Sequence, residues 1–147
     1  MRVILEVDNH DAAVRFFRDE LGLEEQVAFE GAGEARVAIL NAGRATLELS
    51  NPAQMAMIDQ VETGAVGSPP FRLAFEVEDT RGMTKRLTTA GAPLLGEPTV
   101  TPWRSLNARL DSPAGVQITL FEELVPLAER EASAEFGTDR ARRTEPS

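Results

Sequence analysis

Arg2-Val3-Ile4-Leu5-Glu6-Val7 is the stretch that decides the fold, because its pattern returns in the second half of the chain as Arg72-Leu73-Ala74-Phe75-Glu76-Val77. The two segments share Arg, Glu and Val at matching positions and keep apolar residues at the positions between them. In the first segment Val3, Leu5 and Val7 alternate with the other residues, which is typical of a strand with one face on a core. An internal repeat of this kind predicts two copies of one structural unit.

Both halves continue with the same order of elements. The first helix is expected to begin at the cap-rich residues 8–11 and to stop at Gly22, and the second to run from Asp79 to Gly91. Alternating segments predict strands at 25–30, 35–40 and 45–50 in the first half, and near 97–101, 104–110 and 116–122 in the second. The sequence therefore predicts an α+β fold of two tandem βαβββ modules, at residues 1–50 and 71–122.

Two segments fall outside the modules. Pro and Gly residues interrupt residues 51–70, where only Met55, Ile58 and Val61 indicate a short helix, so we expect a linker. Residues 123–147 are rich in Glu, Ala and Arg and have few apolar anchors. We expect a C-terminal helix near 126–136 and disorder toward Ser147.

The composition excludes several classes of function. The chain has no Cys and one His, so it has no disulfide, no thiolate nucleophile and no site that needs several imidazole ligands. A net charge of −9 would repel a phosphate backbone, so we expect no nucleic acid partner. No segment has the apolar length of a membrane span, and the N-terminus lacks the apolar core of a signal peptide. We therefore expect a cytoplasmic protein without a membrane partner.

Three further stretches complete a likeness to a known family. They are Val3 to Gly22 with its Phe16-Phe17-Arg18-Asp19-Glu20-Leu21-Gly22, Leu73 to Asp79, and Thr101-Pro102-Trp103 followed by Asp111-Ser112-Pro113-Ala114-Gly115. With these stretches and its paired modules, the chain resembles the vicinal oxygen chelate superfamily, which includes glyoxalase I, extradiol dioxygenases and bleomycin-resistance proteins. The resemblance implies that the modules form a curved, partly open mixed sheet around a central cavity, and that two chains form a homodimer.

The resemblance also implies four metal-binding positions, a His on each first strand and a Glu on each last strand. In this sequence they hold Arg2, Arg72, Glu48 and Thr119. Guanidinium groups have only hydrogen-bond donors and stay protonated, so they do not ligate a cation. We therefore expect no metal and no other cofactor. Glyoxalase-type isomerisation and extradiol cleavage both depend on the ion, so neither is favoured here.

Strand alternation and the family motif predict a polar cavity wall. A carboxylate between two guanidinium groups can be satisfied by bidentate hydrogen bonds, so Arg2, Glu48 and Arg72 are expected to meet. This triad either joins the modules as a staple or binds an anionic or carbonyl-bearing ligand. The candidate ligand-binding residues are Arg2, Glu6, Glu48, Arg72, Glu76, Trp103, Gln117, Thr119 and Phe121.

Two aromatic side chains and the single histidine each have a structural and a functional interpretation. Trp103 can stack on a ligand, or pack in the module core or a dimer interface. Phe121 can line the cavity or fill the barrel. His10 lies beside two aspartates, where we expect an exposed loop or a helix cap rather than catalysis.

The sequence favours a binding protein of the bleomycin-resistance type, which takes up a small organic molecule, a drug or a metabolite, between its modules. The alternative is a metal-independent isomerase or lyase in which Glu48 or Glu76 is the base and an arginine holds the oxyanion. A neighbouring arginine lowers the pKa of a carboxyl group and makes it a poorer base, which favours the binding hypothesis. A metal-dependent glyoxalase or dioxygenase is the third hypothesis.

Overall fold

The computed structural model describes residues 1–126 together with 128 and 129, and it contains both expected modules. The first comprises β1 Arg2–Glu6, α1 His10–Val14, a π-helical continuation η1 Arg15–Glu20, β2 Glu25–Glu30, the short turn η2 Ala32–Glu34, β3 Arg36–Ala42 and β4 Ala45–Ser50. The second comprises β5 Phe71–Glu76, α3 Thr80–Thr89, β6 Leu94–Val100, β7 Ser105–Asp111 and β8 Gln117–Glu123. The disordered end expected toward Ser147, and all but the start of the expected C-terminal helix, lie outside the described residues.

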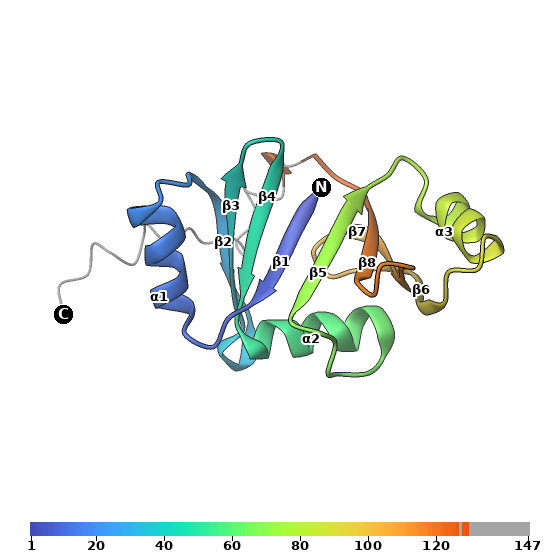
Figure 1. The fold of residues 1–147 in the computed structure, drawn as a ribbon, viewed down its shortest axis with the longest axis horizontal. Coiled ribbons are helices and arrows are strands. Elements are labelled where there is room, and N and C mark those ends of the chain that lie inside the picture. Colours follow the sequence, from blue (N-terminus) through green and yellow to red (C-terminus); the bar gives the residue numbers. More distant parts are fainter. Residues whose placement is uncertain (127, 130–147) are drawn as a thin grey trace.

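The strands of the described chain form one open mixed sheet, in the order β2-β3-β4-β1-β5-β8-β7-β6 (Figure 1). β1 and β5 are antiparallel neighbours at its centre, and each runs parallel to the last strand of its own module. Ile4 of β1 is paired with Arg72 of β5 and with Glu48 of β4. The α+β class and the open mixed sheet that the repeat predicts are confirmed.

The two outer helices each cover a core of their own. Beneath α1, Leu5 and Val7 pack against a buried cluster that includes Val14. Beneath α3, Val77 and Leu87 pack against the buried strand residues of the second module. The alternation of residues 2–7 is supported, since Leu5 and Val7 face α1 while Ile4 faces α2. α1 and α3 lie at opposite ends of the molecule (Figure 1).

A third helix, α2 Pro52–Thr63, connects the modules. Asn51 caps its start, because Asn51 Oδ1 accepts a hydrogen bond from the backbone N–H of Gln54 at 2.9 Å. Gly64 ends it with a φ of 72°, in the left-handed region that glycine adopts without strain. The short helix indicated within residues 51–70 is thus twelve residues long. None of the helices in the described chain is long and apolar enough to cross a membrane.

α2 lies against the sheet face opposite to α1 and α3. Its Met55 packs with Ile4, Ala74 and Phe121, which come from the central strands β1, β5 and β8. Phe121 therefore fills the centre of the curved sheet, one of the two interpretations that the sequence left open. The inner face of the sheet is divided by this contact, and the part over the first module leaves space for a ligand.

Candidate ligand-binding site

A cavity of about 400 Å³ lies between the inner face of the first module, α2, and the turn that joins β6 to β7. Alternate residues of β2 and β3 form its apolar wall, while the residues between them, such as Ala28 and Ala38, face α1. The lining residues are Arg2, Gln26, Val27, Phe29, Glu30, Gly31, Val37, Ile39, Glu48, Gln54, Met57, Ile58, Pro102 and Trp103. The volume lies within the range of about 300–1,000 Å³ that is typical of small-molecule sites.

Arg2 and Glu48 are the charged groups at the end of the cavity nearest the central strands. Arg2 Nη2 donates a hydrogen bond to Glu123 Oε1 at 2.8 Å, and Arg2 Nη1 lies 3.7 Å from Glu48 Oε2. The Arg2 guanidinium carbon is also 4.3 Å from the centroid of the Phe121 ring, a cation–π contact. The cation at this end is therefore already paired with two carboxylates and an aromatic face.

Glu48 is the group at this end with unused hydrogen-bonding capacity. Its side chain is 12% exposed and lines the cavity. Its oxygens accept no hydrogen bond from any residue in the described part of the chain, and its ion pair with Arg2 is long. An ionised carboxylate has about four acceptor positions, so Glu48 can accept hydrogen bonds from a bound molecule.

Trp103 reaches the cavity from a tight turn of the second module. The backbone N–H of Thr101 donates to the carbonyl of Ser105 at 2.8 Å, and the backbone N–H of Ser105 donates to Thr101 Oγ1 at 3.2 Å. Arg104 has a φ of 62°, a backbone conformation that residues other than glycine rarely adopt. Its carbonyl accepts a hydrogen bond from the backbone N–H of Leu124 at 3.1 Å, which helps to hold this conformation.

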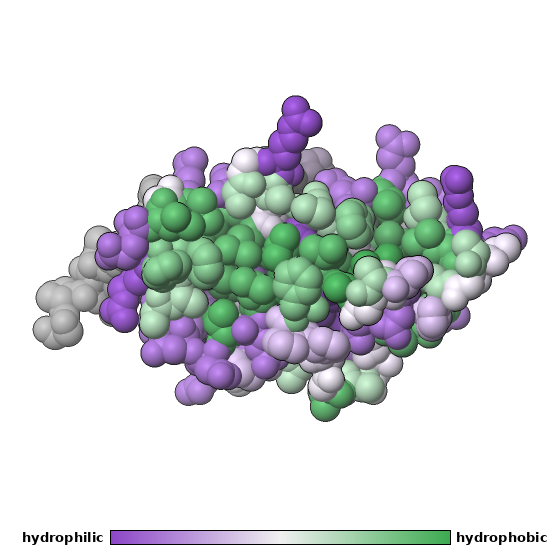
Figure 2. Space-filling model, in the orientation of Figure 1, coloured by the Kyte–Doolittle hydropathy of each residue, from purple (hydrophilic) through white to green (hydrophobic). Residues whose placement is uncertain are grey.

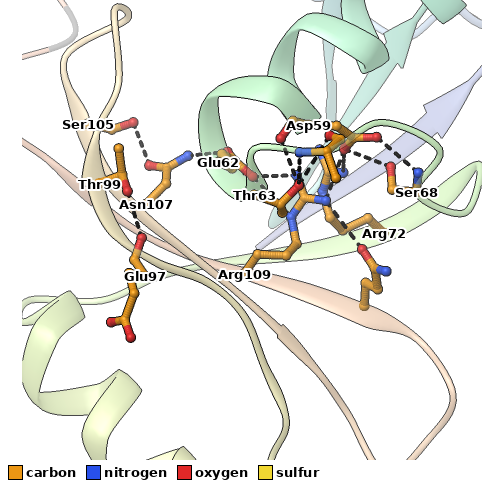
Figure 3. Close-up of polar contacts among 12 residues, drawn as sticks. Asp59, Glu62, Thr63, Ser68, Arg72, Glu97, Thr99, Ser105, Asn107 and Arg109 are labelled. Atoms are coloured by element: carbon orange, nitrogen blue, oxygen red, sulfur yellow. Dashed lines mark hydrogen bonds and ion pairs between the residues drawn. The ribbon is translucent and has the colours of Figure 1, made fainter.

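A buried ionic network holds α2 on the second module (Figure 3). Arg109 of β7 is fully buried, and its Nε donates to Glu62 Oε2 at 3.0 Å while its Nη1 donates to Asp59 Oδ1 at 3.0 Å. Asp59 also accepts hydrogen bonds from the N–H and the hydroxyl of Ser68, at 3.0 and 2.8 Å. Burial raises the pKa of Asp59, but the hydrogen bonds from Ser68 and Arg109 outweigh it and lower the pKa overall. Asp59 is thus held as a carboxylate.

Arg72 lies beside this network rather than in the cavity. It is 2% exposed, its Nη1 is 3.7 Å from Asp59 Oδ1, and its Nε has no hydrogen-bond partner. Burial lowers the pKa of Arg72, and the charge of Arg109 lowers it further, against three nearby carboxylates that raise it. The expected triad is therefore reduced to the pair of Arg2 and Glu48, because α2 supplies a different carboxylate for the second arginine.

The other predicted ligand-binding residues also lie outside the cavity. Gln117 accepts a hydrogen bond from Arg109 Nη1 at 3.3 Å, and Thr119 is buried with no hydrogen-bond partner for its hydroxyl. Glu6 is half-buried near the end of β1. Glu76 is exposed and borders a separate hollow. Glu48 is therefore better placed than Glu76 to act on a molecule in the cavity.

His10 has a structural role that differs from the exposed position expected. It begins α1, is 6% exposed, and donates from Nε2 to the carbonyl of Leu49 at 3.0 Å. Since Leu49 lies on β4, this hydrogen bond ties the start of α1 to the sheet, on the face away from the cavity. Nothing in the local sequence distinguishes this position from an exposed cap.

The side chains at the four metal positions implied by the resemblance do not fit a divalent cation. Arg2 and Arg72 offer donors only, and the pair of Glu48 and Thr119 supplies a single carboxylate. Within residues 1–126, 128 and 129, no three His, Asp or Glu side chains are grouped so that they could hold a metal ion.

Most of the residues that line the cavity were not predicted from the sequence. The apolar wall comes from residues 25–30 and 35–40, which were predicted as strands but not as part of the site. The signal was present, because Val27, Val37 and Ile39 alternate with apolar residues that face α1. A strand that is apolar on both faces indicates that both faces are covered or line an apolar cavity.

Comparison with known proteins places these features in a family. Residues 2–120 match the Glyoxalase/Bleomycin resistance protein/Dioxygenase superfamily. No curated protein matches the sequence significantly.

Solved structures share the fold. A hypothetical protein from Bacillus halodurans is 17% identical with a TM-score of 0.65, and the match covers 85% of this chain and 94% of that one. Methylmalonyl-CoA epimerase from Mycobacterium tuberculosis is 23% identical with a TM-score of 0.64, covering 87% and 89%. A superfamily member from Vibrio splendidus is 16% identical with a TM-score of 0.56, covering 83% and 98%. At these identities, the likeness concerns the fold alone.

Proposed function

Because this chain belongs to the glyoxalase/bleomycin resistance protein/dioxygenase superfamily, we propose that it uses the family's cavity to bind a small organic molecule without a metal ion. The ligand is mostly apolar and partly aromatic, and it carries a polar head group that donates hydrogen bonds, such as an amine or a hydroxyl. The observation that carries this proposal is the position of Glu48, a carboxylate with unused acceptor capacity at the end of an apolar cavity.

The charges around Arg2 favour a donor head group over an anionic one. Arg2 is already paired with Glu123 at 2.8 Å and approached by Glu48 at 3.7 Å. An anionic head group would place a third negative charge beside this single guanidinium, and Arg72 is too deeply buried to compensate it. The anionic ligand that the sequence suggested depended on two free arginines in the cavity, and only one of them lines it.

The experiment compares three probes that share one apolar body: para-butylbenzylamine, para-butylphenol and para-butylbenzoate. Trp103 is the only Trp of the chain and lines the cavity, so its fluorescence reports binding directly, and calorimetry gives the affinities. We expect the amine and the phenol to bind, and the benzoate to bind at least about tenfold more weakly, a difference of about 1.4 kcal/mol. Absence of binding by all three refutes the proposal. A preference for the benzoate refutes the donor head group.

Glu48→Gln removes the charge while keeping the shape of the side chain. We expect the affinity for the amine to fall about tenfold and the difference between the amine and the benzoate to disappear. Glu76→Gln is the matched control, because Glu76 is exposed and lies outside the cavity. Equal effects of the two substitutions would show that Glu48 does not contact the ligand.

A second candidate function, a metal-independent isomerase or lyase, is favoured by the same carboxylate. Glu48 as base would take a proton from a carbon next to a carbonyl, and Arg2 would stabilise the oxyanion that forms. Exchange of the α-protons of phenylacetone in heavy water, followed by NMR, tests for such a base without knowledge of the substrate. Exchange that is faster with the protein and is lost in Glu48→Gln supports catalysis, and no acceleration leaves binding as the function.

We further propose that two chains form a homodimer. Apolar side chains gather across the middle of one face of the molecule, over the strands between α1 and α3 (Figure 2). Phe71 and Phe75 of the central strand β5 are 40% and 36% exposed. Large exposed apolar patches usually mark interaction surfaces, so this face is the expected contact between two chains. Native mass spectrometry of the protein and of Phe75→Ser tests this proposal. A monomeric wild-type protein refutes it.

A further inference from the structure

Two parts of the chain outside the first module close its cavity: α2, which connects the modules, and the turn of the second module that carries Trp103. A chain of buried side-chain hydrogen bonds connects these two parts (Figure 3). We infer that Glu62 and Asn107 are positioning residues, which fix Trp103 relative to α2 and so set the width of the cavity before a ligand arrives. This inference rests on the proposed function, since it explains how that site is shaped.

The chain of contacts begins at the base of the turn. Thr101 Oγ1 lies 3.0 Å from Ser105 Oγ, and Ser105 Oγ donates to Asn107 Oδ1 at 2.6 Å. Asn107 Nδ2 then donates to Glu62 Oε1 at 2.7 Å, which crosses from β7 to α2. All four residues are at most 5% exposed, so water does not compete for these contacts.

Glu62 is the junction of the chain, because its two oxygens have different partners. Oε1 accepts from Asn107, and Oε2 accepts from Nε and Nη2 of Arg109. Arg109 also binds Asp59, which lies one turn earlier on the same face of α2. α2 is therefore held at two points, and one of them is tied directly to the turn.

The close approach of α2 to β6 leaves no room for adjustment at this point. A Cβ atom on Gly96 would clash with the backbone carbonyl oxygen of Glu62. Glycine at position 96 therefore lets the helix backbone seat on the strand at the residue that anchors the chain. With backbone and side chain both fixed, α2 and Trp103 form two rigid walls.

Rigid walls determine what such a cavity selects. Trp103 from the turn and Met57 and Ile58 from α2 line the same space, so their separation limits the thickness of the ligand. A cavity that is already formed avoids the entropy cost of ordering its walls on binding. The positioning chain therefore favours flat, rigid ligands and raises the affinity for them.

The variant Asn107→Leu tests this inference, because it removes the link to the turn and leaves the pair of Glu62 and Arg109 in place. In the ligand-free protein, we expect faster fluorescence depolarisation of Trp103 and about twofold stronger quenching by acrylamide, because the turn loses its tie to α2. The affinity for para-butylbenzylamine should fall about tenfold as the preformed width is lost. Leu110→Val is the matched control, since Leu110 lies on the same strand but packs beneath α3.

The outcomes separate this inference from the proposed function. If Trp103 in Asn107→Leu is as immobile as in the wild type, the inference is wrong whether or not a probe binds. If the wild-type protein binds none of the probes, the proposed function fails, and the mobility of Trp103 still decides the role of the chain. If circular dichroism shows that Asn107→Leu is unfolded, Ser105→Ala interrupts the same chain with a smaller change and is judged by the same measurements.

Discussion

Replacing Arg109 by Met is expected to destabilise the protein strongly, although Met is flexible and apolar. Arg109 is the only cation that hydrogen-bonds both acids of α2 in the described chain, and it is fully buried. Without it, Asp59 and Glu62 would remain at 3% and 4% exposure without their main counter-charge. Removal of one partner from a buried ion pair costs about 3–5 kcal/mol, because the remaining charge is neither hydrated nor paired.

The structure places the expected cost near the lower end of that range. Asp59 would keep both hydrogen bonds from Ser68, and Glu62 would keep the one from Asn107. Arg72 would also lose its repulsion from Arg109. We therefore expect a loss of about 3 kcal/mol, against a total stability of about 5–15 kcal/mol for a domain. For a chain of this length, that corresponds to a fall in Tm of about 10 °C.

Thermal unfolding followed by circular dichroism measures this change. Arg86→Met is the matched control, because Arg86 is exposed on α3 and forms no ion pair with a described residue, so its Tm should stay within about 2 °C of the wild type. The triple variant Arg109→Met, Asp59→Asn, Glu62→Gln removes the buried charges together and should recover part of the loss. Arg109 does not compensate the buried acids of α2 if Arg109→Met melts within about 2 °C of the wild type, or if the triple variant is less stable than the single one.

Three further predictions concern α2, the cavity and pH. Gly96→Ala should lower the free energy of unfolding by about 1–3 kcal/mol, because the new Cβ atom clashes with the Glu62 carbonyl. Gly31→Ala should change it little, because its Cβ atom meets only the Ala35 side chain at 3.4 Å. Urea unfolding compares the two variants, and equal effects would contradict the close approach of α2 to β6. Val27→Phe should fill the cavity and weaken binding of para-butylbenzylamine more than about tenfold, with a stability cost below about 1.5 kcal/mol. Ala28→Phe, one residue along and packed beneath α1, should prevent stable folding. If both variants fold and bind equally, the assignment of the two strand faces is wrong. The lowered pKa of Asp59 means that its contribution to stability is present above the unfolded value of 3.8 and is lost as the pH falls through the lower folded value. The difference in Tm between the wild type and Asp59→Asn should therefore be constant from about pH 5 to 7 and shrink below about pH 4, and a difference that grows in acid would contradict this.

The sequence was sufficient for the repeat and for most elements of the fold. Residues 2–7 show their strand period directly, and Asp79 begins a helix as its capping side chain predicts. These signals are local, because each one depends on a few residues and on the geometry of one element. The repeat then placed β1 and β5 in equivalent positions, and their pairing at the centre of the sheet agrees with that equivalence.

The length and the position of α2 were not accessible in the same way. Its buried face mixes the polar residues Gln54, Asp59 and Glu62 with Met55 and Ile58, so the apolar pattern in the sequence is weak and understates the length of the helix. The burial of its acids makes sense only with Arg109, about fifty positions later in the chain. A polar core of this kind is recognised only from the folded structure, because the pairing partners are far apart in the sequence.

The same reason explains the error at Arg72. Its position at the inner face follows from alternation, but its partner was assumed to be Glu48, which also lies next to the centre of the sheet. The structure instead gives it Asp59 of α2 at 3.7 Å. Arg2, Glu48 and Trp103 line the cavity in the structure, because their position depends on strand register and on the turn between β6 and β7 rather than on α2, and their part in binding a ligand stays a prediction.

The separation between the anchors of α2 and the wall of the cavity bears on how this fold changes over evolutionary time. The residues that hold the helix belong to β7 and α2, whereas the apolar wall comes from alternate positions of β2 and β3. Substitutions at Val27, Val37 or Ile39 can therefore alter the shape offered to a ligand without touching the buried ionic network. The frame is thus separate from these cavity-facing positions, so substitutions there allow descendants of such a chain to acquire new ligands without first losing their ability to fold.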